Sequence, residues 1–195
     1  MPQFPINIRF KVFGIAPQIF VEDSAGKSVF YVKQKLFKLK EAVKVFSDSS
    51  QKETLFEINA DRVLDFNAKY HFKDSAGADV GAVGRQGVKS LFKAHYDVYE
   101  GEALVATIRE EAAWKRIVER FLAEVPLIGF IAIYLINPTY LVTRADGTLV
   151  MKLKKLPSFL GRKFQITKEA DLDEAEQQRN LLSLMMMVLL ERSRG

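Results

Sequence analysis

The sequence contains no cysteine, and this absence removes several kinds of chemistry. A chain without thiols forms no disulfide, no cysteine nucleophile and no cysteine-ligated zinc site, and it carries no palmitoylated cysteine. Histidine is scarce too: His71 and His95 each lie beside a tyrosine in an alternating segment, without metal-ligand spacing. Such histidines are typical of ordinary strand residues. We therefore expect no metal site, and a reducing cytoplasm is the simplest compartment.

Long apolar runs are missing as well. The two most apolar stretches, 125–136 and 181–190, are shorter than the roughly 20 residues that a membrane-spanning helix needs. The first five residues, Met-Pro-Gln-Phe-Pro, lack the charged start and continuous apolar stretch of a secretory signal. We expect no transmembrane span, and a cytoplasmic protein that contacts membranes only peripherally.

The familiar catalytic and cofactor motifs are not found. Gly81, Gly84 and Gly87 have neither of the spacings that phosphate-binding glycine loops require, so we interpret them as glycines that let another element approach a strand closely. No serine lies in a nucleophile elbow. The sequence predicts no enzyme, no cofactor and no small-molecule substrate. An enzyme would need a constellation that forms only in three dimensions, which is the less favoured alternative.

The composition is that of a folded protein with a basic surface. Hydrophobic residues make up 48% and charged residues 27%, which argues against disorder, and fifteen phenylalanines favour strands. At 195 residues, one all-β domain spanning 1–195 is favoured over two domains. The net charge of +5 favours acidic partners, including anionic lipid headgroups and nucleic acid.

One pattern repeats along the chain: alternating apolar residues, a short polar turn, and alternating apolar residues again. Hairpins are predicted at 19–32, 43–58, 70–80, 95–108 and 140–151, and a further strand is predicted near 163–167. An aspartate in a tight turn accepts hydrogen bonds from the backbone ahead of it, and glycine supplies a positive φ. We therefore interpret Asp23, Asp48, Asp74 and Asp146 as turn residues and not as metal ligands.

Two segments follow a helical period instead. Residues 114–125 form an amphipathic pattern that ends at Pro126, within a predicted helical insertion near 112–137; residues 127–136 fit either a buried strand or a packed helix. Acidic residues at 171–176 mark the start of a second helix that runs to about Glu191. Because 181–190 is apolar all round and too short to span a bilayer, protein must enclose it.

The candidate binding residues are basic. One lysine group begins at Lys33, and a second group flanks the turn 156–161, which carries Phe159 and Leu160 at its tip. Cations beside an apolar tip suit an anionic membrane surface. The candidate residues for an anionic surface are Lys33, Lys35, Lys152, Lys154, Lys155, Phe159, Arg162 and Lys163.

Lysines also commonly solvate the outer strands of barrels, so the clusters by themselves leave the partner open. Anionic lipid headgroups and an acidic protein are the two partners we expect. A nucleic-acid-binding module is a further alternative, although no helix-turn-helix, zinc or basic-helix pattern is present.

The series of Asp-x-x-Gly hairpins, exemplified by residues 21–33 and followed by the final apolar helix, resembles the LURP-one-related proteins. Their wider group joins the tubby C-terminal domain and the phospholipid scramblases. The resemblance covers about 10–166 plus the terminal helix, and is interrupted by 114–137. It implies a closed, roughly twelve-stranded antiparallel barrel threaded by its C-terminal helix. Tubby domains bind phosphoinositide headgroups through a lysine–arginine pocket, but no residue of that pocket is carried over to this sequence.

Overall fold

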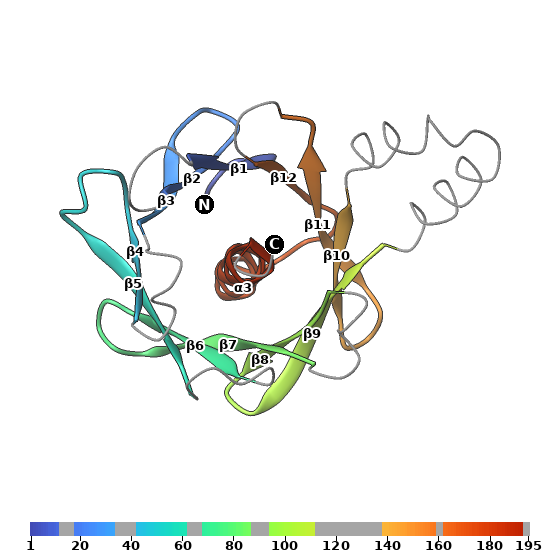
Figure 1. The fold of residues 1–195 in the computed structure, drawn as a ribbon. Helices are drawn as coiled ribbons and strands as arrows, with labels where there is room; N and C mark the ends of the chain where they lie inside the picture. The colour runs from blue at the N-terminus through green and yellow to red at the C-terminus, as the bar shows by residue number, and fades with distance from the viewer. Residues whose placement is uncertain are drawn as a thin grey trace.

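The computed structural model is a closed barrel of twelve antiparallel strands around a single central helix (Figure 1). It describes residues 1–11, 18–33, 42–61, 68–86, 94–111, 138–158 and 162–192. Each strand pairs with its neighbours in the chain, and β1 closes the ring by pairing with β12. The strands are β1 (Ile6–Lys11), β2 (Gln18–Glu22), β3 (Ser28–Lys33), β4 (Val43–Phe46), β5 (Thr54–Ala60), β6 (Lys69–Asp74), β7 (Asp79–Arg85), β8 (His95–Glu100), β9 (Ala103–Glu110), β10 (Thr139–Arg144), β11 (Leu149–Leu156) and β12 (Lys163–Lys168).

The five predicted hairpins are confirmed, and so is the strand near 163–167, which is β12. β1 was not predicted: its alternating Ile6, Ile8 and Phe10 complete the ring only through pairing with β12, at the other end of the chain. The predicted insertion 112–137, including the 127–136 segment, lies outside the described residues.

The tight turns have the predicted chemistry. Asp23 Oδ1 accepts hydrogen bonds from the backbone N–H groups of Ala25 and Lys27 at 3.0 and 2.9 Å. Asp74 repeats this arrangement at 2.9 and 2.8 Å, and Asp48 and Asp146 each accept one such bond. Gly26, with φ of 79°, supplies the left-handed backbone that the first turn requires. The aspartates are therefore turn residues, as the sequence predicts.

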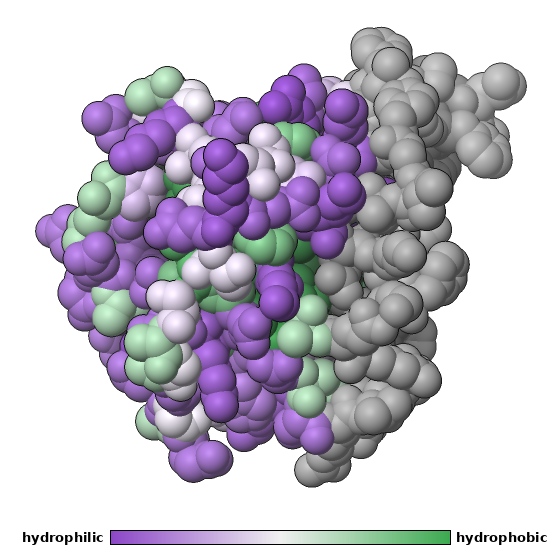
Figure 2. All heavy atoms as spheres, turned by 90° about the vertical axis from the view of Figure 1, so that its left-hand side faces the viewer, coloured by the Kyte–Doolittle hydropathy of each residue, from purple (hydrophilic) through white to green (hydrophobic). Residues whose placement is uncertain are grey.

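The alternation of side chains explains why the barrel closes around a filled core. Residues of one parity, such as Ile8, Val32 and Ile166, point inward and are almost fully buried, whereas the other parity faces outward. On the side that carries β4 and β5, the outer surface is mostly hydrophilic (Figure 2). A ring of about eight strands is filled by its own side chains, so twelve strands leave room for a further element.

That element is the helix α3 (Glu174–Arg192). Its start is capped by Asp173, whose Oδ1 accepts a hydrogen bond from the N–H of Glu176 at 2.8 Å. From Leu181 to Leu189 every side chain is buried, so the prediction of an enclosed apolar helix is confirmed. In the described part of the chain, no helix has the length and apolarity needed to cross a membrane.

Polar contacts fix the helix along the barrel axis. Near its start, Arg144 of β10 forms two 2.7 Å hydrogen bonds with the Glu176 carboxylate. One turn later, Arg179 forms an ion pair with Glu100. The strands and the helix are therefore held in one register by charge-assisted bonds as well as by apolar packing.

A glycine makes the Arg179 contact possible. A Cβ on Gly81 would lie 2.5 Å from the Tyr99 carbonyl oxygen and 2.8 Å from Arg179 Cδ, and the φ of Gly81 is +135°. The interpretation of this glycine as a point of close approach is confirmed. A Cβ on Gly84, three residues on, would make its closest contact with the flexible Lys69 side chain, at 3.2 Å, and Gly87 lies outside the described residues.

Leu184→Asp should lower the free energy of unfolding by about 4 kcal/mol or more, because it places an unpaired carboxylate at a site with 0% exposure. Chemical denaturation measures the change. Ala175→Asp is the matched control, since Ala175 is exposed in the first turn of the same helix, where a carboxylate is favoured. A cooperative Leu184→Asp protein of wild-type stability would contradict the enclosure of α3.

Gly81→Ala should destabilise the protein by about 2 to 4 kcal/mol, because the new methyl group overlaps backbone and the φ is unfavourable. Gly84→Ala in the same strand should cost less than about 1 kcal/mol. Thermal unfolding of the two variants compares them directly. If the two variants lost the same stability, the close approach of Arg179 to β7 would not be the reason that a glycine is needed at position 81.

Candidate functional site

The two ends of the barrel differ in what they carry. At the turn end lie the tight aspartate turns and the start of α3; at the exit end lie the last turn of α3 and the first residues of β10 and β12. Five of the candidate residues come together at the exit end, on the arc from β11 through β12 and β1 to β3. With Lys11 they form what we call the basic rim: Lys11, Lys33, Lys154, Lys155, Arg162 and Lys163.

The strand register brings the rim residues within about two positions of one another along neighbouring strands. Lys163 of β12 stands opposite Arg9 of β1, and Lys11 stands opposite Gln18, which in turn stands opposite Lys33 of β3. Four strand spacings of about 4.8 Å separate β11 from β3, so the rim extends over roughly 20 Å. The rim is therefore a contiguous surface on one arc of the barrel.

The other candidate residues do not join this surface. Lys152 points outward nearer the turn end, and its ammonium lies 3.1 Å from the Glu169 carboxylate. Lys35 and Phe159 lie outside the described residues. The structure thus divides the second lysine group. Lys152 is paired with Glu169, whereas Lys154 and Lys155 belong to the rim.

The turn end has the opposite charge. Its cations are outnumbered, and Arg144, Lys168 and Arg179 among them are paired with Glu176, Asp171 and Glu100. Its carboxylates are Glu22, Asp23, Asp48, Glu53, Asp74, Asp79, Glu100, Glu102, Asp146, Glu169, Asp171, Asp173, Glu174 and Glu176. The barrel therefore carries a charge asymmetry along its axis, acidic at the turn end and basic on the rim. The rest of the exit end, the arc from β5 to β9, carries charges of both signs. There the carboxylates of Asp61, Glu110 and Glu111 lie among basic side chains.

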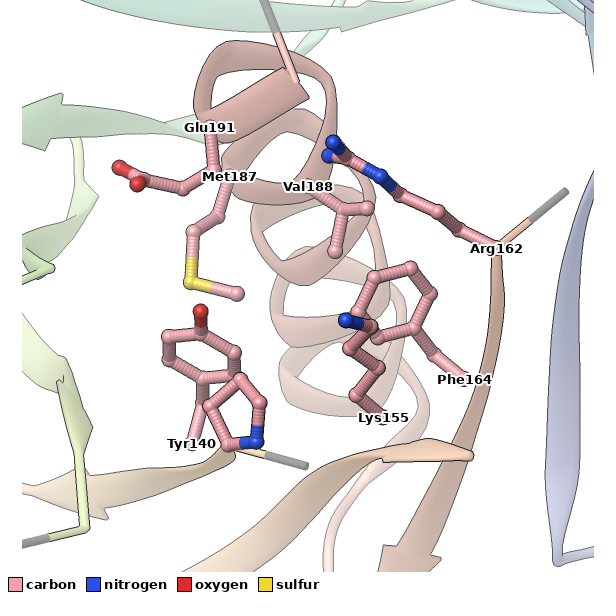
Figure 3. A pocket seen from close by; sticks show the side chains of 8 residues that line it. Tyr140, Lys155, Arg162, Phe164, Met187, Val188 and Glu191 are labelled. Atoms are coloured by element: carbon pink, nitrogen blue, oxygen red, sulfur yellow. The ribbon is translucent and has the colours of Figure 1, made fainter. Parts of the chain in front are cut away.

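A cavity of about 230 Å³ opens inside the rim, between α3 and the ends of three strands (Figure 3). Its polar groups come from Tyr140 of β10, Lys155 of β11, Arg162 just before β12, and Glu191 of α3. Its apolar wall consists of Pro138, Phe164, Met187 and Val188. The Tyr140 hydroxyl points toward the Met187 side chain, whereas Arg162 extends toward α3 from one side and Glu191 extends away from α3 on the other side (Figure 3).

Glu191 is engaged on the side away from Arg162. The Tyr96 hydroxyl donates a 2.5 Å hydrogen bond to its carboxylate, and the Arg85 guanidinium lies 3.7 Å away. Burial raises the pKa of Tyr96 far above its ordinary value, and the Glu191 charge raises it further. Burial likewise raises the pKa of Tyr140, with Glu110 and Glu191 adding to the effect. Both phenols therefore stay protonated at neutral pH and act as donors.

The cations around the cavity lack such partners. Among the described residues, no carboxylate forms an ion pair with Lys155, Arg162 or Arg192. The Arg192 guanidinium lies 5.1 Å from the centre of the Phe10 ring, and its buried Nη1 has no hydrogen-bond partner there. Burial lowers the pKa of Arg192, and the positive charge of Arg162 lowers it further. Like charges thus act on one another at this end of the barrel.

This arrangement suits the binding of an anion better than it suits catalysis. Two side-chain cations and a phenol donor line a concave site, while its carboxylate is already hydrogen-bonded. No cluster of histidine and carboxylate side chains that could hold a metal ion occurs in the ranges that the structure describes.

Sequence reasoning found Lys155 and Arg162 but not the other residues in or beside the cavity. Tyr140, Glu191 and Arg192 were not among the candidates, because no local motif contains them. The sequence did contain a signal that Lys155 points into the barrel. Lys155 shares strand parity with Met151 and Leu153, which are fully buried, whereas Lys154 has the opposite parity.

Comparison with family models supplies the remaining finding. The model of the LURP-one-related family matches residues 28–182, which is more than half of the chain. Comparison with curated proteins and with solved structures gives no significant match. The hairpin series, the closed twelve-stranded barrel and its central helix are those that the resemblance to this family implied. The chain belongs to the LURP-one-related family.

Proposed function

We propose that this protein is a non-enzymatic binding module that associates peripherally with anionic phospholipid surfaces through its basic rim. The observation that carries the proposal is the separation of charge along the barrel: six cations lie on one arc of the exit end, and carboxylates dominate the turn end. A protein with this asymmetry has a preferred orientation on a negative surface, rim toward the lipid and turn end away from it.

The magnitudes support measurable binding. A basic side chain near an anionic membrane contributes about 1 kcal/mol, so the rim cations acting together give an affinity that can be measured. Their contributions add only if all of them reach the same plane. Their common position at one end meets that condition when the barrel axis stands steeply on the membrane.

The support for a non-enzymatic role comes from the hydrogen bonds that the acidic side chains form. Asp23, Asp48 and Asp74 are bound to turn backbone, and Glu176 and Glu191 are bound to Arg144 and Tyr96. These are structural hydrogen bonds, and they occupy the carboxylates that would otherwise be candidates for acid–base chemistry.

Co-sedimentation with vesicles tests the proposal. Wild-type protein should sediment with vesicles that contain phosphatidylserine and not with phosphatidylcholine vesicles, and binding should fall as salt is raised, because exposed charges are screened beyond about 10 Å at 0.1 M. Lys33→Glu combined with Lys163→Glu should weaken binding at least about 30-fold, since two attractive charges become repulsive.

The matched control reverses two exposed lysines at the turn end, Lys27→Glu with Lys52→Glu, and has the same net charge as the rim variant. It should bind like wild type. Equal binding by the two variants would show attraction by net charge alone, and would contradict the role of the rim. Failure of the wild type to bind vesicles at low salt would exclude the lipid surface and leave an acidic protein or nucleic acid as the partner.

A further inference from the structure

The cavity inside the rim holds more positive charge than its own carboxylate neutralises. Lys155 and Arg162 line it, and the charge of Arg162 also acts on Arg192, whose guanidinium lies over the Phe10 ring; that ring meets the Phe164 ring of the cavity wall edge to face. Placing like charges close together in a partly buried site costs free energy. Such a cost is offset when an anion occupies the site.

Glu191 is not the anion that neutralises these cations. Its carboxylate points to the opposite side of α3 from Arg162 and is bound by the Tyr96 hydroxyl, with Arg85 nearby (Figure 3). Glu110 stands directly opposite Tyr140 on the neighbouring strand β9 and acts on it electrostatically, but it is not among the residues that line the cavity. The space between Lys155, Arg162 and Tyr140 therefore presents donors of hydrogen bonds.

We propose that this cavity is a binding site for a phosphate monoester group, held by Lys155, Arg162 and the Tyr140 hydroxyl. The proposal deepens the proposed function, because the cavity lies within the basic rim. It assigns a particular headgroup chemistry to one place on the rim. The rim as a whole, by contrast, is attracted to any negative surface.

The charge and the donors fit this group. A phosphate monoester carries a charge of about −1.5 to −2 at pH 7 and three strong acceptor oxygens. An arginine can bind two of these oxygens through its planar fork, and a lysine supplies a point charge for a third. Tyr140 can donate because a phenol is protonated at neutral pH, and burial raises its pKa further.

The size and the wall of the cavity narrow the ligand further. Its volume of about 230 Å³ is below the roughly 300 to 1,000 Å³ of sites for drug-sized molecules, and well above the about 30 Å³ of one water molecule. A phosphate with a few attached carbon atoms is of suitable size. The carbon atoms would lie against Met187, Val188 and Phe164, which offer apolar contact.

Met187 provides a reporter inside the site. The chain has five methionines, of which Met187 lines the cavity, whereas Met151 lies in β11. In protein labelled at the methionine methyl carbons, added inorganic phosphate or glycerol 3-phosphate should shift the Met187 resonance saturably. Met151 should respond little, and chloride at equal ionic strength should leave the Met187 resonance in place.

Lys155→Gln and Arg162→Gln should each raise the dissociation constant of glycerol 3-phosphate about tenfold or more, because each removes a charged donor. Lys152→Gln is the matched control: it removes the same charge from the same strand, but outside the cavity, and should leave the dissociation constant unchanged. Thermal unfolding verifies that each variant is folded.

The outcomes separate this inference from the proposed function. If Met187 does not respond to phosphate beyond the chloride reference, or if Lys152→Gln weakens binding as much as Lys155→Gln, the phosphate site is refuted, whether or not vesicles bind. Saturable binding that depends on Lys155 and Arg162 supports the site even if wild-type protein ignores phosphatidylserine vesicles.

The source of the phosphate group is distinguished by a second comparison. If a lipid presents it, wild-type protein should prefer vesicles containing phosphatidic acid over phosphatidylserine vesicles of equal surface charge, and Lys155→Gln should abolish the preference. If a soluble ester presents it, glycerol 3-phosphate should bind with no such preference between vesicles.

Discussion

The burial of α3 inside the barrel is the interaction on which the remaining structure depends. Twelve strands enclose more volume than their own side chains fill, and the helix supplies the missing apolar side chains. Leu182, Leu184 and Met186 have no exposed surface, and each buried side chain of this size contributes about 1.5 to 3 kcal/mol. Because α3 follows all twelve strands in the chain, the core is complete only when the last element is in place.

The position of the helix also determines where the candidate site lies. Arg144 and Glu100 hold its first turns at the acidic end, and Tyr96 holds its last turn at the opposite end. These bonds bring Glu191 and Arg192 to the mouth of the barrel, beside Lys155 and Arg162. The charge asymmetry and the cavity are thus consequences of how α3 is anchored, and a change in helix register would alter both.

Much of the fold was predictable because its signals are local. A hairpin needs only alternation and a turn, and both are present in residues such as Asp74 and Gly77, which adopt the expected turn. The apolar stretch 181–190 excludes a surface helix by itself. β1 was missed because the pairing of Ile6 with Ile166, which closes the ring, joins opposite ends of the chain.

The candidate site was predictable only in part, and for a related reason. The basic residues are visible in the sequence, but Lys152 and Lys155, three residues apart, serve different surfaces: the first pairs with Glu169, and the second faces the cavity. Strand parity could have separated them. The contact of Tyr96 with Glu191, which holds this carboxylate on the side of α3 away from Arg162, joins residues far apart in the chain, and no local pattern indicates it.

Native-state hydrogen exchange of the α3 amides tests the central claim most directly. If the helix is the core around which the barrel closes, amides 182–189 should exchange only through global unfolding, with the same free energy and the same denaturant dependence as the whole protein. The strands around them should exchange no more slowly. Exchange of these helix amides through a smaller opening, while the strand amides remain protected, would show that the barrel stands without its helix and would contradict the account.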